Sequence, residues 1–245
     1  MYDALLLDHD GVIVDLLALD SLESGILSHG KPCYRALGIE PDDSLRDALS
    51  IGAIASDIQQ LASSHGVDAS ELWRCRDDAA EQTLQEATRT GEKDPYDDVS
   101  VLESVELPVG VASNNQRRIV EFILAHHDLT HLFETVWGRE PTIESLGRKK
   151  PEPTYLLGAM EDMSVENPLY VGDSETDVIA ANRAAVDCAF IRRSHNAETP
   201  LSVDPAYEVT GLDQVVAILG GTRVPQKRTE CGYDRSERSK RTPQK

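Results

Sequence analysis

The stretch ALLLDHDGVIVD, residues 4–15, carries two aspartates two positions apart where an apolar run ends. The run Ala4–Leu7 is predicted as a buried strand, because consecutive apolar residues suit a strand that is covered on both faces. Asp8 and Asp10 follow this strand directly, and Gly11 is typical of a turn. Ligands of an open parallel sheet bind beyond the carboxyl ends of its strands. The stretch therefore predicts both a sheet and a functional site at its edge.

Further along the chain, short apolar runs alternate with helical patterns. This alternation predicts an α/β fold with a doubly wound parallel sheet flanked by helices. The other predicted strands are Pro108–Ala112, Thr135–Trp137, Leu169–Val171 and Cys188–Ile191, and helices are predicted to begin at Gln116, Pro153, Thr176 and Leu212.

The roughly ninety residues between the first two strands show helical patterns and no convincing strand. Helices are expected over Leu16–Leu27, over 47–66 and from Ala69 to Gly91. Asp68 followed by Glu71 favours a capped start for the last of these, and Gly91 a stop. We therefore expect a core of residues 1–15 and 95–221, into which residues 16–94 are inserted as a helical cap.

Charge is distributed unevenly over the chain. Residues 222–245 hold eight Lys and Arg against three Asp and Glu, which leaves 16 basic and 40 acidic residues in 1–221. Few apolar side chains occur in that basic tail, so we expect it to be disordered. The acidic body argues against binding to nucleic acid or to an anionic membrane. Together with its scarcity of lysine, it favours adaptation to high salt.

The four cysteines are far apart and include no CxxC pair, which argues against zinc and against a disulfide framework. Their spacing suits a reducing interior. No segment reads as a membrane span, so a cytoplasmic protein is expected. The oligomeric state stays open and a monomer is compatible with the sequence.

Chemically active side chains follow several predicted strands. The carboxylates among them form a hard oxygen set suited to Mg²⁺ with a substrate phosphate. One carboxylate could attack phosphorus, and a second, two residues on, could move the proton. The groups expected to meet at one sheet edge are Asp8, Asp10, Ser113, Asn114, Lys150, Asp173 and Asp177.

Each group also has a purely structural explanation. Asp8 and Asp10 could start a turn, and Ser113 could cap a helix. Ser174 and Asp177 fit a capping box. Lys150 could be a surface lysine, although the proline after it opens a helix. It is improbable that all of these structural explanations hold at once for motifs that follow one another in this order at strand ends.

The order and spacing of these motifs resemble the haloacid dehalogenase superfamily of phosphohydrolases. DHDGVIVD is similar to its first motif, VASNN to its second, KKPEP to its third and VGDSETDV to its fourth. The resemblance covers residues 2 to about 219, and the helical insertion lies where capped members carry theirs. His9 and Ala185 depart from the pattern, since relatives often have an apolar residue and a glycine there.

The resemblance implies an Mg²⁺-dependent phosphatase that forms an aspartyl-phosphate on a small phosphorylated metabolite, of the phosphoglycolate or sugar-phosphate type. By motif, it gives the catalytic residues as Asp8 (nucleophile), Asp10 (acid/base) and Lys150; the phosphate-binding residues as Ser113, Asn114, Lys150 and Gly11; and the metal ligands as Asp8, Asp10, Asp173 and Asp177.

Other functions remain open at this point. A phosphomutase related to beta-phosphoglucomutase would carry the same motifs, and the motifs do not separate it from a phosphatase. Asp10 argues against a dehalogenase. A non-enzymatic phospho-acceptor of the receiver type would be shorter and would have no cap. No recognisable substrate code is visible in the cap, although Arg46, Arg74 and Arg76 could anchor a substrate anion.

Overall fold

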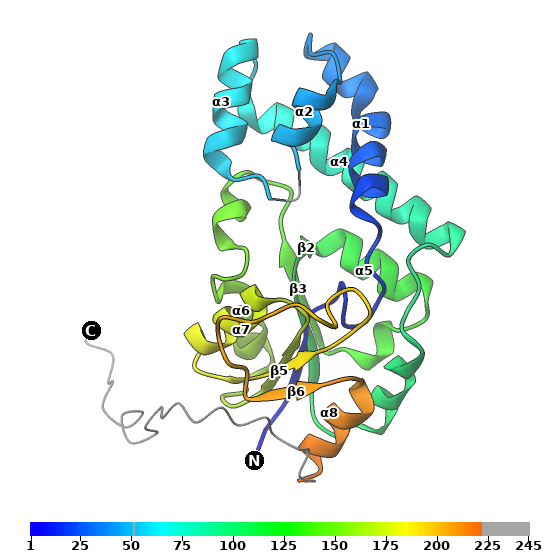
Figure 1. The fold of residues 1–245 in the computed structure, drawn as a ribbon, viewed down its shortest axis with the longest axis vertical. Coiled ribbons are helices and arrows are strands. Elements are labelled where there is room, and N and C mark those ends of the chain that lie inside the picture. The colour runs from blue at the N-terminus through cyan, green and yellow to red at the C-terminus, as the bar shows by residue number, and fades with distance from the viewer. Residues whose placement is uncertain (51, 222–245) are drawn as a thin grey trace, which may run out of the picture.

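The computed structural model describes residues 1–50 and 52–221 and contains one sheet of six parallel strands (Figure 1). Their order is β3-β2-β1-β4-β5-β6, so β1 lies between β2 and β4. Leu5 of β1 pairs with Val109 on one side and with Leu169 on the other. The strands are β1 (Leu5–Leu7), β2 (Val109–Gln116), β3 (Thr135–Arg139), β4 (Leu169–Gly172), β5 (Asp187–Ile191) and β6 (Tyr207–Val209).

All five predicted strands are confirmed, and β6 was not predicted. Two of its three residues are only partly buried at the sheet edge, so the apolar signal of the strand is weak. The second strand extends four residues beyond the predicted end at Ala112, with an irregular pairing to β3 between Ala112 and Gln116. Ser113 therefore lies within β2, and it does not cap the helix that begins at Arg117.

Helices cover both faces of the sheet, as a doubly wound fold requires. One face packs against α5 and α8 through residues such as Ile119 and Val215. The other packs against α6 and α7 through Tyr155 and Val178. The helices are α5 (Arg117–His126), α6 (Thr154–Met163), α7 (Glu175–Arg183) and α8 (Leu212–Leu219), with 3-10 turns η1 (Asp97–Ser104), η2 (Thr130–Leu132) and η3 (Glu144–Arg148).

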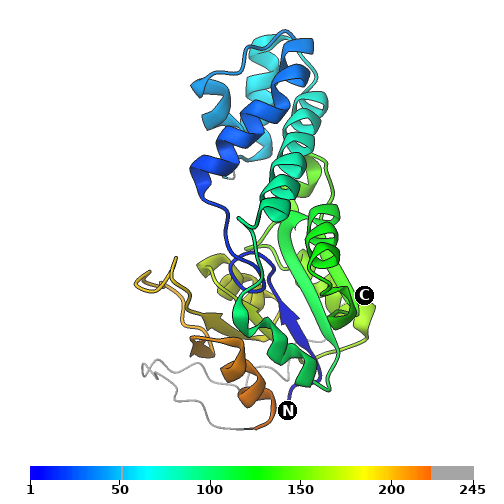
Figure 2. The ribbon, with the colours of Figure 1, turned by 90° about the vertical axis from the view of Figure 1, so that its right-hand side faces the viewer.

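Four helices between β1 and β2 stand above the carboxyl end of the sheet (Figures 1 and 2). The Asp68 side chain accepts hydrogen bonds from the amides of Ser70 and Glu71, and Gly91 ends the last helix with φ +77°, as predicted. The helices are α1 (Leu19–Ala36), α2 (Asp43–Ala48), α3 (Ala55–His65) and α4 (Ala69–Thr90).

The single helix predicted over 47–66 is wrong, because the structure has two helices there. The first begins earlier, where the Asp42 side chain accepts a hydrogen bond from the amide of Leu45. It ends at Ala48, and α3 begins at Ala55. Gly52 lies between them, and glycine is a poor helix former.

The cysteine prediction also needs correction, because Cys33 of α1 and Cys75 of α4 form a disulfide. They are 42 positions apart in the sequence, but α1 packs along α4 and brings their Cα atoms to 5.7 Å. Cys188 is free and buried. Cys231 and the predicted disordered tail lie outside the described residues.

Two chain segments connect the four helices to the sheet and run side by side. The amide of Asp15 donates to the carbonyl of Asp94 at 2.9 Å, and the amide of Tyr96 donates to that of Ile13 at 3.0 Å. Lys93 lies just before this pairing. Residues 93–96 are therefore next to the first motif.

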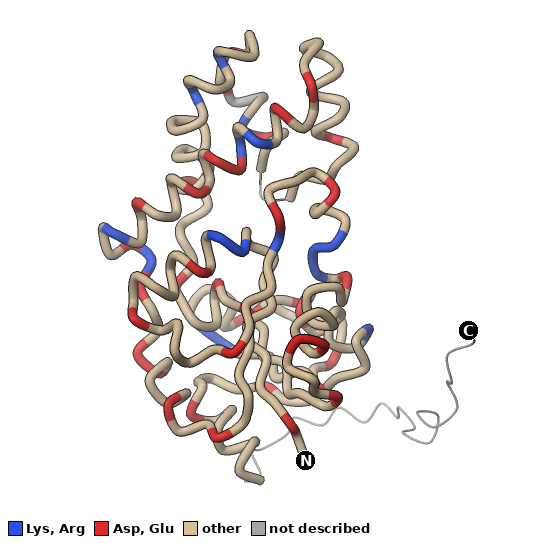
Figure 3. The backbone as a smooth tube through the Cα atoms, turned by 180° about the vertical axis from the view of Figure 1, so that it is seen from behind, with Lys and Arg blue, Asp and Glu red and all other residues tan. Residues whose placement is uncertain are grey.

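Acidic residues are spread over both the sheet region and the four helices, with fewer basic residues among them (Figure 3). Within the described part of the chain, no helix is both long enough and apolar enough to cross a membrane.

Candidate active site

Three predicted residues from distant parts of the sequence meet in one buried cluster. The ammonium of Lys150 lies 2.7 Å from Asp8 Oδ2 and 2.7 Å from Asp177 Oδ1. It also donates to the hydroxyl of Tyr170 at 2.9 Å, and that hydroxyl donates to Asp177. Lys150 is 4% exposed and Asp177 is fully buried, so these charges interact with little screening.

Asp173 completes an acidic group that could hold a metal ion. Asp8, Asp173 and Asp177 each offer an oxygen, and these atoms lie within 4.8 Å of one another. Gly11 is needed for this approach, because a Cβ built on it would lie 2.1 Å from Asp173 Oδ2 and its φ is +77°. Asp10, which the resemblance gives as a metal ligand through its backbone carbonyl, contributes no side-chain oxygen to this group.

Burial, helped by the neighbouring carboxylates, raises two pKa values in this group. Burial, together with the neighbouring Asp177 and Asp173, raises the pKa of Asp8 to about 8, against the lowering effect of Lys150. Burial likewise raises the pKa of Asp173, although a hydrogen bond from His195 opposes it. Three carboxylates share one ammonium here, so a divalent cation with hard oxygen preferences fits the charge of the site.

Asp177 serves both as a helix cap and as part of the cluster. Its Oδ2 accepts from the amide and hydroxyl of Ser174, which completes the predicted capping box of α7. Its Oδ1 faces Lys150 and Tyr170. Burial raises the pKa of Asp177, but Lys150 and these hydrogen bonds outweigh burial and lower it. Asp177 therefore holds Lys150 in place for Asp8.

Asp10 has a different environment, formed by the segment that leads back from the helices. The Lys93 ammonium forms an ion pair with Asp10 Oδ1 and donates to the Asp15 carbonyl at 2.8 Å. The Asn115 amide donates to Asp10 Oδ2 at 3.0 Å. Burial alone would raise the pKa of Asp10, but Lys93 and the adjacent His9 hold it well below its ordinary value. Asp10 is therefore ionised at neutral pH.

The residues after the second predicted strand lie beside the cluster. Ser113 is buried and lines the cavity next to Asp8. Asn114 also lines it, but its side chain binds the backbone of Lys150, accepting from the Lys150 amide at 2.6 Å and donating to its carbonyl at 3.3 Å. Asn114 thus fixes the segment that carries Lys150.

A cavity of about 360 Å³ extends from Asp8 to the helices above it. On the core side it is lined by Asp8, Asp10, Lys93, Ser113 and Lys150. Towards α1 and α4 the wall becomes apolar, with Leu16, Leu17, Leu22, Trp73, Ala80 and Leu84.

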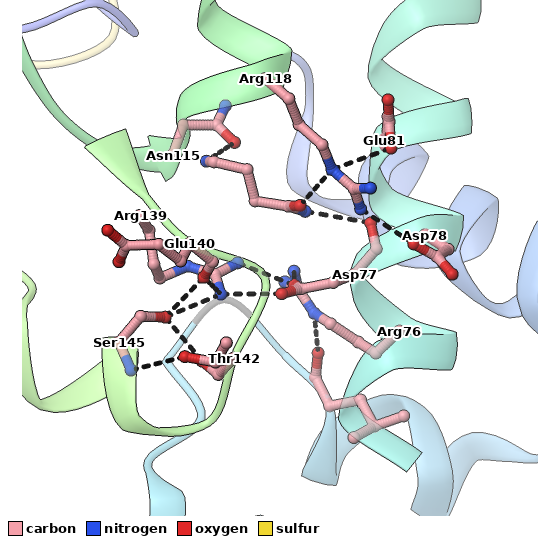
Figure 4. A network of polar contacts seen from close by, with 12 residues as sticks. Arg76, Asp77, Asp78, Glu81, Asn115, Arg118, Arg139, Glu140, Thr142 and Ser145 are labelled. Carbon is pink, nitrogen blue, oxygen red and sulfur yellow. Dashed lines mark hydrogen bonds and ion pairs between the residues drawn. The ribbon is translucent and has the colours of Figure 1, made fainter. Parts of the chain in front are cut away.

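Charged groups also join α4 to the core at the edge of this cavity, a region we call the seam (Figure 4). Asp77 of α4 is fully buried and accepts two hydrogen bonds from Arg139 at the end of β3, at 2.7 and 2.8 Å. Arg76 donates to the same carboxylate at 3.1 Å. Nearby, Arg118 of α5 contacts Asp78 and, with its Nε, Glu81.

Sequence reasoning missed Lys93, Asn115, Tyr170, Arg139 and His195 as members of the site. A signal for Lys93 was present, because only four lysines occur in residues 1–221. Three of these, Lys93, Lys149 and Lys150, line the cavity. His195 lies 2.7 Å from Asp173 Oδ2, and no motif pointed to it. Of the three arginines considered as anchors, Arg76 alone lines the cavity.

Comparisons with known proteins agree with this architecture. A phosphoglycolate phosphatase of Photorhabdus laumondii is 26% identical over 115 residues, covering 46% of this chain and 48% of that protein. The chain spans about half the length of the curated relatives it matches first.

Two solved structures share the fold at 18% identity. A predicted phosphoglycolate phosphatase from Haemophilus somnus has a TM-score of 0.60, covering 89% of this chain and 98% of that one. A putative beta-phosphoglucomutase from Thermotoga maritima has a TM-score of 0.57, covering 89% and 99%. The family model described as haloacid dehalogenase-like hydrolase matches residues 56–191, more than half of the chain. The chain therefore belongs to the haloacid dehalogenase-like hydrolase family.

Proposed function

We propose that this protein is a Mg²⁺-dependent phosphatase that hydrolyses a small phosphorylated metabolite through an aspartyl-phosphate on Asp8. The observation that carries the proposal is the cluster of Asp8, Lys150 and Asp173 at one end of the cavity. Mg²⁺ held by Asp8 and Asp173 would neutralise charge on the transferring phosphate. The similarity to a protein named phosphoglycolate phosphatase supports this class of substrate.

The residues divide the work between two steps. Asp8 attacks phosphorus, while Lys150 and Ser113 bind the phosphate oxygens in the water-poor end of the cavity. Asp10 then accepts a proton from the water that hydrolyses the aspartyl-phosphate. Its contact with Lys93 favours the ionised form that this second step requires. In the first step Asp10 would pass a proton from the incoming phosphate monoester to the leaving oxygen, and it would be ionised again before water attacks.

In this proposal residues 16–94, which contain the four helices above the sheet, form a cap. Residues 1–15 and 95–221 form the core. Leucines on α1 and α4 line the cavity and would exclude water from bound substrate. The paired connectors near Asp15 and Asp94 would form the hinge. Because Lys93 lies on one connector and contacts Asp10, cap position and the acid/base group are physically linked.

A sugar phosphomutase of the same family is the second candidate, supported by the likeness to a putative beta-phosphoglucomutase. It would use the same Asp8 and Asp10, and would pass the phosphoryl group to a second sugar hydroxyl in place of water.

The test is a phosphate-release screen over phosphoglycolate, sugar phosphates and nucleotides, with Mg²⁺ and high KCl. We expect phosphate release from one small-metabolite class, and a loss of more than about 10³-fold in Asp8→Asn with the fold retained. An undiminished rate in Asp8→Asn would remove Asp8 as the nucleophile. Isomerisation of a sugar phosphate without phosphate release would identify the mutase.

A further inference from the structure

The cavity has a second charged region, formed by the seam, that the chemistry at Asp8 does not use. Arg76 of α4, Arg139 of β3 and Lys149 all line it. The two guanidinium groups share one carboxylate, that of Asp77. Lys149 adds its charge to the same wall. Among the described residues, the two guanidinium groups therefore carry more charge than the one carboxylate they share, in a place where water screens it poorly.

One buried hydrogen-bond donor in this region has no partner among the described residues. Arg76 is 8% exposed and donates through Nε to the Leu49 carbonyl and through Nη1 to Asp77. Trp73, which is 2% exposed and also lines the cavity, has a buried Nε1 without a hydrogen-bond partner in the described part of the chain. A buried donor without a partner is costly, so an acceptor supplied by a ligand would stabilise it.

The donors belong to one compact group. The guanidinium carbons of Arg76 and Arg139 lie 5.0 and 5.3 Å from the centre of the Trp73 ring. The Lys149 pKa is lowered by burial and by the charges of Arg139 and Arg76, which agrees with a positive field at this wall. Apolar residues from α1 and α4 occupy the rest of the cap-side wall.

We propose that Arg76, Lys149 and Trp73 form a subsite for a second anionic group of the substrate. The substrate is then a phosphate monoester with a carboxylate or a second phosphate at the far end of a short apolar linker. This inference rests on the phosphatase function proposed above and narrows its substrate class. Arg139 is a positioning residue, because its Nη atoms are bound to Asp77 and Ser145.

The chemistry of guanidinium groups favours this assignment. Arginine binds carboxylate and phosphate groups through paired N–H donors. These hydrogen bonds are stronger than hydrogen bonds between neutral groups. A hydrogen bond to a charged group contributes about 1.5–3 kcal/mol, which corresponds to about a tenfold to hundredfold preference. A sugar phosphate without a second charge would offer these donors only neutral hydroxyl acceptors, which form weaker hydrogen bonds than a carboxylate or phosphate does.

The experiment uses the full chain with Mg²⁺ and two matched substrate series. One series is carboxyalkyl phosphates of increasing chain length, beginning with phosphoglycolate, and the other is alkyl phosphates of equal length. Alkanediol bisphosphates form a third arm that distinguishes phosphate from carboxylate as the second anion. We expect kcat/KM to favour one anionic series by at least about tenfold at one chain length.

Arg76→Gln and Lys149→Gln are the informative variants, and Arg74→Gln is the matched control. Arg74 lies on the same helix but is exposed and does not line the cavity. Arg76→Gln and Lys149→Gln should each reduce the preference for the anionic series by about tenfold. Arg74→Gln should change neither the preference nor the rate with alkyl phosphates. If Arg76→Gln fails to fold, the preference of Lys149→Gln for the anionic series alone tests the subsite.

Equal kcat/KM for anionic and alkyl esters would overturn the subsite while leaving the phosphatase proposal in place. An unchanged preference in both variants would also overturn it. If no ester in any series releases phosphate, the proposed function fails and the subsite fails with it.

Discussion

The two ends of the cavity have opposite charge patterns. At the sheet end, three carboxylates share one ammonium, that of Lys150. At the seam, Arg76 and Arg139 share one carboxylate, that of Asp77. Each cluster satisfies only part of its own charge, so a cation is expected to stabilise the first and an anion the second. A phosphate ester with an anionic tail and its metal ion would complete both.

The clusters also differ in how they depend on the fold. The sheet cluster lies within one body, where neighbouring strands of one sheet fix its members. The seam joins α4 to β3, so its geometry depends on where the four helices sit over the sheet. If the four helices move as the proposed cap, Arg76 would separate from Arg139, whereas Asp8 and Lys150 would stay together.

The largest expected effect comes from breaking the seam with Asp77→Asn. This change leaves two buried guanidinium groups without their carboxylate, and loss of one partner of a buried ion pair costs about 3–5 kcal/mol. We expect the free energy of unfolding in urea, at high KCl, to fall by that amount.

Asp78→Asn is the matched control on the same helix. Its partner Arg118 is 38% exposed, so the pair contributes less than about 1 kcal/mol. A loss for Asp77→Asn as small as that of the control would show that the seam does not hold the cap to the core.

The two clusters also differ in whether they could be predicted from the sequence. Asp8, Lys150, Asp173 and Asp177 could be predicted together from the order of their motifs. Asp8 and Asp173 directly follow neighbouring strands of one parallel sheet, Asp177 lies in the helix after β4, and Lys150 lies shortly before α6. Their meeting follows from the topology alone. Gly11 was predicted as a phosphate ligand, whereas its positive φ and closeness to Asp173 give it a backbone reason to be glycine.

The seam could not be predicted in the same way. Asp77 and Arg139 are 62 positions apart, and only the packing of the cap on the core brings them together. The Cys33–Cys75 disulfide was missed for the same reason, since it depends on α1 lying along α4. The break between α2 and α3 was missed because apolar periodicity continues through a short connection.

A smaller effect is expected when Mg²⁺ binds at the sheet cluster. We expect the free energy of unfolding to rise by about 2–3 kcal/mol. The pKa of Asp8 is raised to about 8, so the metal-free folded protein holds a proton there between about pH 4 and pH 8. The unfolded chain releases that proton at lower pH, so this group makes the metal-free protein less stable as pH rises through that range.

Mg²⁺ must displace the same proton, so its stabilising effect should grow with pH. We expect a larger rise in Tm on adding Mg²⁺ at about pH 9 than at about pH 6. Asp173→Asn should abolish most of this difference, because it removes a carboxylate from the cluster. An equal rise at both pH values would contradict a protonated Asp8 in the metal-free protein.

The smallest effect tests the scaffold beneath the sheet cluster and leaves both charged clusters untouched. Ala185 follows α7 with φ +61°, where the amide of Val186 donates to the carbonyl of Ala181. This left-handed conformation costs a residue with a Cβ about 1 kcal/mol more than it costs glycine. Ala185→Gly should therefore raise the free energy of unfolding by about 1 kcal/mol, less the entropy that glycine adds to the unfolded chain. α7 carries Asp177 at its opposite end. An unchanged kcat in Ala185→Gly would show that Asp177 is already held by its own hydrogen bonds. A changed kcat would show that the cluster depends on the rigidity of the whole helix.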